Sequence, residues 1–193
     1  MPSKTETACA EKYIFLDRDG VINRDSDTYV KNWSEFEFLP GSLDALERLT
    51  AAGYRIIIIT NQSIVGRKWV PLETLEDIFA RMQAAVEAHG GRIHDIFFCP
   101  HTPDDGCRCR KPATGLIEAA VRTYDIDLST TAMIGDSAKD IICARRAGCR
   151  SAILVKSGNY AAAAERLRQA NITPDAVTAD LQAAVAWLLD RGV

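Results

Sequence analysis

The fold of this chain is decided by an apolar run that ends at two carboxylates, Tyr13-Ile14-Phe15-Leu16-Asp17-Arg18-Asp19-Gly20-Val21. Four consecutive large apolar residues at its start predict a buried strand. A carboxylate at the end of a buried strand costs several kcal/mol of desolvation unless a cation pairs with it. The run therefore predicts a strand that carries Asp17 and Asp19 into a functional site.

Short apolar runs alternate with segments of helical period along the rest of the chain. We expect strands at 54–59, 96–98, 132–134, 152–155 and 176–177, and helices at 41–52, 71–89, 115–124, 137–147 and 181–189. This alternation predicts an α/β fold with a single Rossmann-like parallel sheet and helices on both faces. Ligands of such sheets bind beyond the carboxyl ends of the strands. Three of the apolar runs end there at Asp17, Thr60 and Asp136.

Length and composition indicate an ordinary globular protein. The 193 residues suit one domain, which we place at 12–193 after an N-terminal tail at 1–11. A net charge of -3 argues against nucleic acid or an anionic membrane as a partner. No apolar run approaches the roughly 20 residues that cross a bilayer, and the polar start does not resemble a secretory signal. We therefore expect a cytoplasmic protein.

The carboxylates at the strand ends suggest a metal site. A few carboxylates that leave room for water and phosphate oxygens suit Mg²⁺. Any one of these aspartates has an alternative role as a helix N-cap or a turn residue. Their occurrence at successive strand ends, with Thr60 and Lys111 elsewhere in the chain, favours a catalytic magnesium site that includes Asp17, Asp19 and Asp136.

Four short motifs resemble those of the haloacid dehalogenase superfamily and follow the same order. They are Asp17-Arg18-Asp19-Gly20-Val21, Thr60-Asn61-Gln62-Ser63, Lys111-Pro112 and Gly135-Asp136-Ser137-Ala138-Lys139-Asp140. The resemblance implies phosphatase chemistry, in which Asp17 attacks phosphorus as a covalent nucleophile. Asp19 would act as general acid and then as general base. Mg²⁺ would be held by the Asp17 and Asp136 carboxylates and by the Asp19 carbonyl oxygen.

The other two motifs supply groups for the transferring phosphoryl. The resemblance implies that the Thr60 hydroxyl and the Lys111 ammonium hold its oxygens, which carry the charge of the transition state. Asp140, one helical turn after Asp136, supports the metal, orients Lys111 or is simply an acid on a helix face. These alternatives stay open at this point.

A second metal site is predicted by four residues in an eleven-residue segment. Three thiolates and one imidazole make a complete tetrahedral ligand set for a structural zinc ion: Cys99, His101, Cys107 and Cys109. The alternative is a buried Cys99 with free thiols beyond it. Zinc would pin a loop that is too short to form its own core. It would also position Arg110 and Lys111, which follow directly.

The zinc loop narrows the resemblance to the zinc-bearing branch of the superfamily, which contains heptose-bisphosphate phosphatases and histidinol-phosphatases. The first loop and a neutral Ser63 favour a sugar bisphosphate, and Arg110 suits its second phosphate. The candidate substrate-binding residues are Asp25, Tyr29, Asn61, Gln62, Ser63, Arg67 and Arg110. The alternatives are a histidinol-phosphate phosphatase and a non-catalytic, zinc-stabilised binding module.

The spacing of the motifs leaves no insertion large enough for a cap domain, so we expect a shallow site. The resemblance also suggests a monomer. The segment after the second motif departs from the family, which commonly has Gly-x-x-Arg-Gly, because this chain reads Ile64-Val65-Gly66-Arg67-Lys68.

Overall fold

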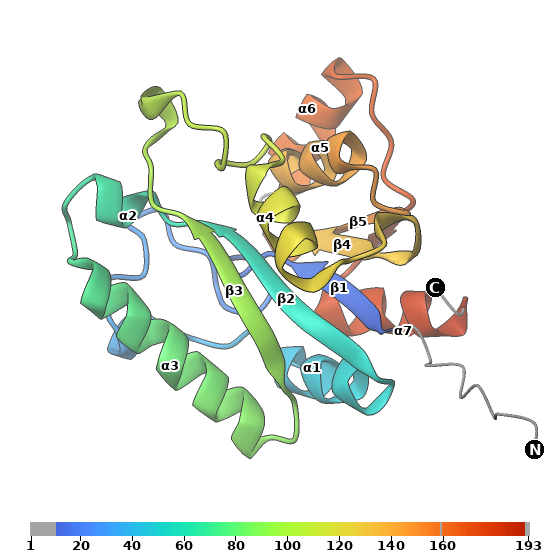
Figure 1. The fold of residues 1–193 in the computed structure, drawn as a ribbon, viewed down its shortest axis with the longest axis horizontal. Coiled ribbons are helices and arrows are strands. Elements are labelled where there is room, and N and C mark those ends of the chain that lie inside the picture. The colour runs from blue at the N-terminus through green and yellow to red at the C-terminus, as the bar shows by residue number, and fades with distance from the viewer. Residues whose placement is uncertain (1–10, 159, 192–193) are drawn as a thin grey trace, which may run out of the picture.

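The computed structural model describes residues 11–158 and 160–191, and six parallel strands form one sheet in the order β3-β2-β1-β4-β5-β6 (Figure 1). The strands are β1 (Lys12–Leu16), β2 (Tyr54–Asn61), β3 (Ile93–Cys99), β4 (Ala132–Gly135), β5 (Ser151–Val155) and β6 (Ala176–Thr178). This is the strand order of a Rossmann-like sheet. The predicted fold class is therefore confirmed, and no cap domain covers the sheet in the described part of the chain.

Helices cover both faces of the sheet (Figure 1). One face packs against α1 (Ser42–Ala51), α3 (Leu72–Ala88) and α7 (Leu181–Asp190). The other face packs against α4 (Gly115–Tyr124), α5 (Ala138–Ala147) and α6 (Tyr160–Gln169). The short α2 (Ser63–Gly66) follows β2, and 3-10 helices span Trp33–Glu35, Pro103–Asp105 and Leu128–Thr130.

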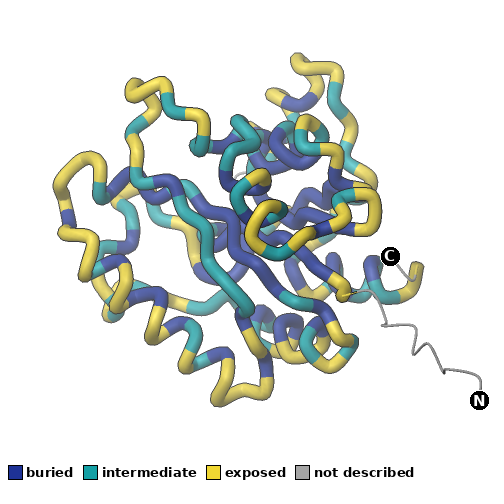
Figure 2. Tube along the Cα trace, viewed as in Figure 1, coloured by how far each residue is buried: buried dark blue, intermediate teal, exposed yellow. Residues whose placement is uncertain are grey.

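The central strands are apolar throughout because both of their faces are covered. In β1, Ile14 and Leu16 pack with the α1, α3 and α7 side, while Phe15 packs with the opposite side. The isoleucines of β2 alternate in the same way and are fully buried: Ile56, Ile57, Ile58 and Ile59. Figure 2 shows this buried layer running through the molecule between more exposed helices.

The sequence analysis missed α6 and shortened β3. An alanine-rich run at 161–164 followed by Leu167 favours a helix and is the signal for α6. Strand β3 lies at the edge of the sheet and is only half-buried over most of its length. It therefore lacks the continuous apolar run by which buried strands are recognised.

The predicted N-terminal tail lies outside the described residues except for Glu11, whose carboxylate contacts Arg55 and accepts a 2.6 Å hydrogen bond from the Tyr13 hydroxyl. Among the described helices, none combines the length and apolar character that a membrane span requires.

The strand order places the ends of β1 and β4 side by side. Leu16 pairs with Ile134, and the Asp17 amide donates to the Ile134 carbonyl at 3.0 Å. The chain crosses from β1 to β2 on one side, whereas β4 is followed by β5 on the other. This is the switch point at which open parallel sheets bind ligands, so it brings Asp17 and Asp136 to one crevice.

Candidate active site

A cavity of about 410 Å³ opens at the carboxyl ends of the strands. Its described lining includes most of the predicted site residues: Asp17, Asp19, Asp25, Tyr29, Thr60, Asn61, Arg110, Lys111 and Asp136. Gln62, Ser63 and Arg67 are not among the described lining residues, and their side chains lie behind Thr60 or beside Tyr29.

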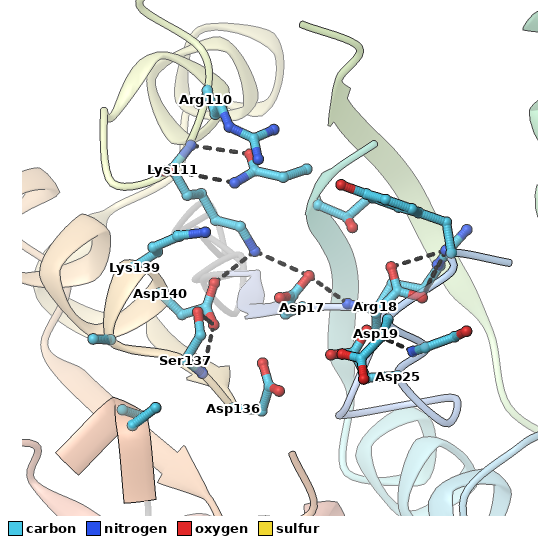
Figure 3. Close-up of a pocket in the computed structure, with 18 of the residues that line it drawn as sticks. Asp17, Arg18, Asp19, Asp25, Arg110, Lys111, Asp136, Ser137, Lys139 and Asp140 are labelled. Carbon is cyan, nitrogen blue, oxygen red and sulfur yellow. Dashed lines mark hydrogen bonds and ion pairs between the residues drawn. The ribbon is translucent and has the colours of Figure 1, made fainter. Parts of the chain in front are cut away.

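Three carboxylates converge on the floor of this cavity (Figure 3). Asp17, Asp136 and Asp140 are all buried, and each offers an oxygen within 4.8 Å of the other two. Burial, together with the negative charges of Asp140 and Asp17, raises the pKa of Asp136 to about 9. A buried acid under such repulsion is suited to cation binding, since a bound cation would offset the cost of ionisation.

Glycines make the close approach to Asp136 possible. A Cβ atom on Gly20 would lie 2.2 Å from the Asp136 Oδ2 atom, and one on Gly158 would lie 1.8 Å from it. Gly20 also has a φ of +76°, which L-residues rarely adopt. Any side chain at either position would therefore displace the Asp136 carboxylate.

Lys111 is the buried counter-charge of this acidic floor. Its Nζ atom lies 2.9 Å from Asp17 Oδ1 and 2.6 Å from Asp140 Oδ1, and it donates to the Ile59 carbonyl at 2.6 Å. Burial alone would lower the pKa of Lys111, but Asp140 and Asp17 hold it above the usual value. These three contacts occupy its three donors, so Lys111 could donate a hydrogen bond to a ligand only after releasing one of them.

Asp17 titrates unusually for an aspartate. Burial is the main cause that raises its pKa to about 7, and the negative charges of Asp140 and Asp19 act in the same direction. The nearby ammonium of Lys111 opposes this shift. Asp17 is thus a desolvated carboxylate, whose ionised form Lys111 stabilises.

Asp140 has two contacts in the structure. One is the ion pair with Lys111, and the other is a capping box at the start of α5. There it accepts hydrogen bonds from the Ser137 amide at 3.0 Å and the Ser137 hydroxyl at 2.7 Å. Asp140 therefore orients Lys111 and caps a helix at the same time, and its oxygens also belong to the three-carboxylate group.

The Asp19 carboxylate points away from that group toward a buried arginine. Arg18 donates to it from Nε at 3.2 Å and from Nη2 at 2.7 and 2.8 Å, and Asn23 donates at 2.9 Å. Although burial acts in the opposite direction, Arg18 and these hydrogen bonds lower the pKa of Asp19. The Arg18 guanidinium is 1% exposed and lies 5.7 Å from the centre of the Phe79 ring.

Two residues that follow Thr60 in the second motif, Asn61 and Ser63, bond to other parts of the protein. Asn61 makes a reciprocal pair with the backbone of Lys111, donating to its carbonyl at 3.2 Å and accepting from its amide at 3.0 Å. Asn61 lines the cavity, but its amide group is used to hold the third motif against the second. Ser63 donates to the Tyr29 hydroxyl oxygen at 3.3 Å and is buried.

Tyr29 and Arg110 line the rim of the cavity, and Trp69 and Arg67 pack beside Tyr29. The Tyr29 ring packs edge-to-face on Trp69 with 5.4 Å between centroids, and the Arg67 guanidinium lies 5.5 Å from the Trp69 ring. The hydrogen bond from Ser63 is the main cause that lowers the pKa of Tyr29, and the charges of Arg67 and Arg110 add to it. Arg110 donates to the His101 carbonyl at 3.1 Å.

Lys68 stands in the rim segment with a φ of +58°. The left-handed region costs a non-glycine residue about 1–2 kcal/mol, whereas glycine costs about 0.5–1 kcal/mol through chain entropy. We therefore expect Lys68→Gly to raise the free energy of unfolding by about 0.5–1 kcal/mol in urea denaturation. Lys68→Ala keeps the Cβ atom and is expected to give no such gain. Equal effects of the two variants would contradict this explanation.

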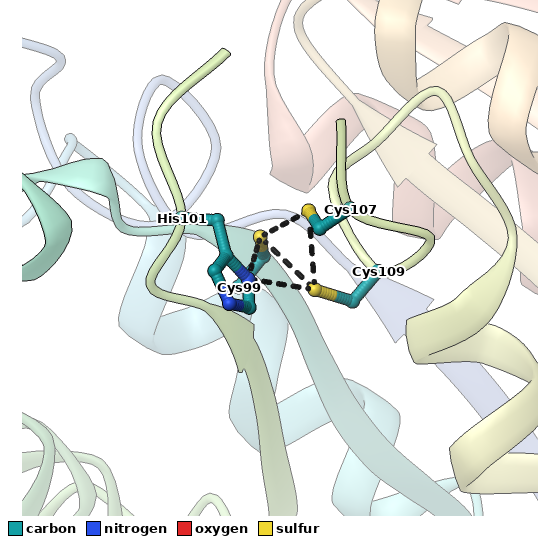
Figure 4. Close-up of side chains that lie close together, drawn as sticks. All are labelled: Cys99, His101, Cys107 and Cys109. Atoms are coloured by element: carbon teal, nitrogen blue, oxygen red, sulfur yellow. Dashed lines mark hydrogen bonds between the residues drawn. The ribbon is translucent and has the colours of Figure 1, made fainter. Parts of the chain in front are cut away.

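The four predicted zinc ligands meet at one point above the end of β3 (Figure 4). The Cys99, Cys107 and Cys109 sulfurs are 3.2 to 3.6 Å apart, and the His101 Nδ1 atom is 3.2 Å from Cys109. These sulfurs are too far apart for disulfides, whose S–S bond is about 2.05 Å. Ligands of a tetrahedral zinc lie about 3.8 Å apart. The cluster is therefore suited to zinc.

The cavity also contains residues to which sequence analysis gave no function. Arg18 lies between the two aspartates of the first motif, and a charged residue inside a buried run is the signal that marks it. Lys139 and Arg166 line the wall formed by α5 and α6. Arg166 could be found only after α6 had been recognised.

Comparison with known proteins identifies the class. Residues 108–184 match a family model described as HAD-hydrolase-like. A crystal structure of D,D-heptose 1,7-bisphosphate phosphatase from B. bronchiseptica, complexed with magnesium and phosphate, superposes with a TM-score of 0.85 at 42% identity, covering 93% of this chain and 99% of that one. The fold, the site and these matches define a phosphoric monoester hydrolase of the haloacid dehalogenase type.

Curated relatives narrow the class. The D-glycero-beta-D-manno-heptose-1,7-bisphosphate 7-phosphatase of Bordetella bronchiseptica is 47% identical over 77% of this chain and 82% of its own length. The protein of the same name from Pseudomonas putida is 45% identical over 76% of this chain and 83% of its own length. The chain belongs to the heptose-1,7-bisphosphate 7-phosphatase family, which makes it an enzyme rather than a non-catalytic binding module.

Proposed function

We propose that this enzyme removes the 7-phosphate of D-glycero-D-manno-heptose 1,7-bisphosphate during the synthesis of nucleotide-activated heptose. The observation that carries the proposal is the desolvated Asp17 carboxylate, which faces the cavity beside the buried Lys111 ammonium. The names of the curated relatives support the choice of substrate.

The proposed reaction has two covalent steps. In the first, an Asp17 oxygen bonds to phosphorus while the bond from phosphorus to the sugar oxygen breaks, and that oxygen takes a proton from Asp19. The Asp19 carboxyl must carry that proton against the lowered pKa that Arg18 gives it. In the second, Asp19 takes a proton from water, whose oxygen bonds to phosphorus as the bond to Asp17 breaks. Phosphate leaves, and the Asp17 carboxylate is regenerated.

The buried carboxylates fit a divalent cation, because the ion pairs of Lys111 reach Asp17 and Asp140 rather than Asp136. Asp17 and Asp136, with the Asp19 carbonyl oxygen, would hold Mg²⁺. The ion would neutralise charge so that one anion can approach another. A solved relative was crystallised with magnesium and phosphate, which supports this ion.

Thr60 and Lys111 are the proposed phosphoryl-binding groups. Thr60 is buried at the end of β2 and lines the cavity, where its hydroxyl can donate to a phosphoryl oxygen. Lys111 contributes chiefly its charge, since its donors are directed to protein oxygens. Both act on oxygens that gain negative charge in the transition state.

We further propose that Cys99, His101, Cys107 and Cys109 bind one structural zinc ion. The ligand cluster is closed, with four protein ligands and no position for a substrate. Arg110 and Lys111 continue the chain directly from Cys109. Zinc would therefore set the position of the basic residues that face the substrate.

Arg110 is the proposed ligand of the second phosphate, with Asp25 and Tyr29 at the same rim. Steady-state kinetics with Mg²⁺ should give a kcat/KM at least about tenfold higher for the heptose bisphosphate than for histidinol phosphate. The reason is that a guanidinium–phosphate contact contributes about 1.5–3 kcal/mol. A higher kcat/KM for histidinol phosphate would overturn the substrate and favour the alternative phosphatase.

Cytoplasmic location and a monomeric state stay predictions. Cell fractionation and light scattering of the purified protein would test them.

A further inference from the structure

Gln62 is a buried amide between two groups of the proposed chemistry. It is 2% exposed and is not among the described residues that line the cavity. Its Nε2 atom donates to Asp19 Oδ2 at 2.8 Å and to Thr60 Oγ1 at 2.9 Å. Its backbone amide donates to the Cys99 carbonyl at 2.7 Å, which fixes the residue at the junction of β2 and the zinc loop.

The chemistry of an amide makes these contacts directional. The Nε2 atom carries two hydrogens and accepts none, while an ionised carboxylate only accepts. The contact with Asp19 therefore requires the NH2 end of the Gln62 amide, rather than its oxygen, to face Asp19 and Thr60. The second hydrogen then goes to Thr60, whose oxygen acts as the acceptor. The Thr60 hydroxyl keeps its own hydrogen free to donate into the cavity.

Gln62 also helps to fix the orientation of the Asp19 carboxylate. Arg18 bonds to both oxygens of Asp19, and Asn23 bonds to Oδ1. Among the described contacts, Gln62 supplies the one neutral contact to Oδ2. It directly follows β2, whereas Arg18 and Asn23 belong to the loop after β1. Without Gln62, Asp19 stays paired with Arg18 but loses its link to the strand that carries Thr60.

We propose that Gln62 is a positioning residue that holds the Asp19 carboxylate and the Thr60 hydroxyl in register for the two covalent steps. This inference rests on the proposed function and replaces the sequence-based assignment of Gln62 to substrate binding. Its effect is greatest in the second step, where Asp19 must accept a proton from water as the phosphorus–Asp17 bond breaks. Loss of Gln62 therefore slows breakdown of the aspartyl-phosphate.

The test compares Gln62→Met, which keeps the volume and removes both donors, with the wild type and with Gln83→Met. Gln83 lies on α3 away from the cavity and receives the same chemical change. With p-nitrophenyl phosphate the leaving group needs no proton, so Gln62→Met should release p-nitrophenolate in a burst of one equivalent per site. We expect kcat to fall about 10–100-fold and KM to fall with it, so that kcat/KM changes less than about threefold, because only breakdown of the phosphoenzyme is slowed. Gln83→Met should match the wild type.

A second experiment separates positioning from a structural role. In an Asp19→Asn background, Gln62→Met should lower kcat by less than about threefold, because Gln62 acts through Asp19. Gln62→Leu also removes both donors without adding a charge and provides the same test if Gln62→Met does not fold. A raised KM with unchanged kcat would make Gln62 a substrate ligand and overturn the inference, as would an unchanged kcat without a burst. Failure to trap a phosphoenzyme in the wild type would instead overturn the proposed function.

Discussion

Asp17→Asn is expected to lower kcat by at least about 10⁴-fold, because an amide cannot attack phosphorus and no other described carboxylate takes its place. Asp136 and Asp140 are close by, but Asp140 is held by Lys111 and by the start of α5. Asp136 lies between two glycines at the proposed metal position. Steady-state assays with the heptose bisphosphate and Mg²⁺ would measure the loss.

The same variant should remain folded. The pKa of Asp17 is raised to about 7, so its ionised form costs stability at higher pH. An asparagine removes this charge, while Lys111 keeps its contacts with Asp140 and the Ile59 carbonyl. In magnesium-free buffer at pH 8, we expect an unfolding temperature equal to or above that of the wild type.

The control for this variant is Asp77→Asn, the same change on the exposed surface of α3, where Asp77 pairs with Arg81. It should leave kcat within about twofold of the wild type, since it lies outside the cavity. Phosphatase activity that survives in Asp17→Asn would defeat the covalent mechanism. An unfolded Asp17→Asn protein would contradict the stability argument.

Loss of zinc should have the largest effect on stability. Removal of one ligand by Cys109→Ser is expected to abolish stoichiometric zinc and to lower the unfolding temperature by about 10 °C. The estimate assumes several kcal/mol for the closed site and about 2–4 °C per kcal/mol in a chain of this size. Elemental analysis and calorimetry would measure the two effects.

Activity should fall with the zinc because the loop is bonded to the neighbouring parts of the site. The Gly66 amide donates to the Pro100 carbonyl at 2.9 Å, and Arg110 donates to the His101 carbonyl. We expect kcat/KM for the bisphosphate to fall at least about tenfold. Cys149→Ala, which removes a cysteine outside the cluster, should retain zinc. A zinc-free wild type purified without chelator would contradict the zinc proposal.

Site residues were easiest to predict from the sequence where a polar residue at a strand end has only one physical explanation. Asp17, Thr60 and Asp136 follow apolar runs, and parallel strands bring such ends to one edge of the sheet. The cluster of predicted zinc ligands was equally easy to predict, because its four residues lie in one short segment. Residues with several possible roles were harder to assign. Asn61 was predicted to bind substrate, but its amide group is hydrogen-bonded to the Lys111 backbone.

The sequence by itself determined the class of the fold and the chemical groups at its centre, because both follow from local period and from motifs read in order. Tertiary structure alone decided which neighbours those groups have. Arg18 and Gln62 meet at Asp19 only because β1 and β2 are adjacent. Arg166 reaches the cavity only because α6 packs beside α5. Such contacts join segments far apart in the chain, and local patterns do not encode the distances between them.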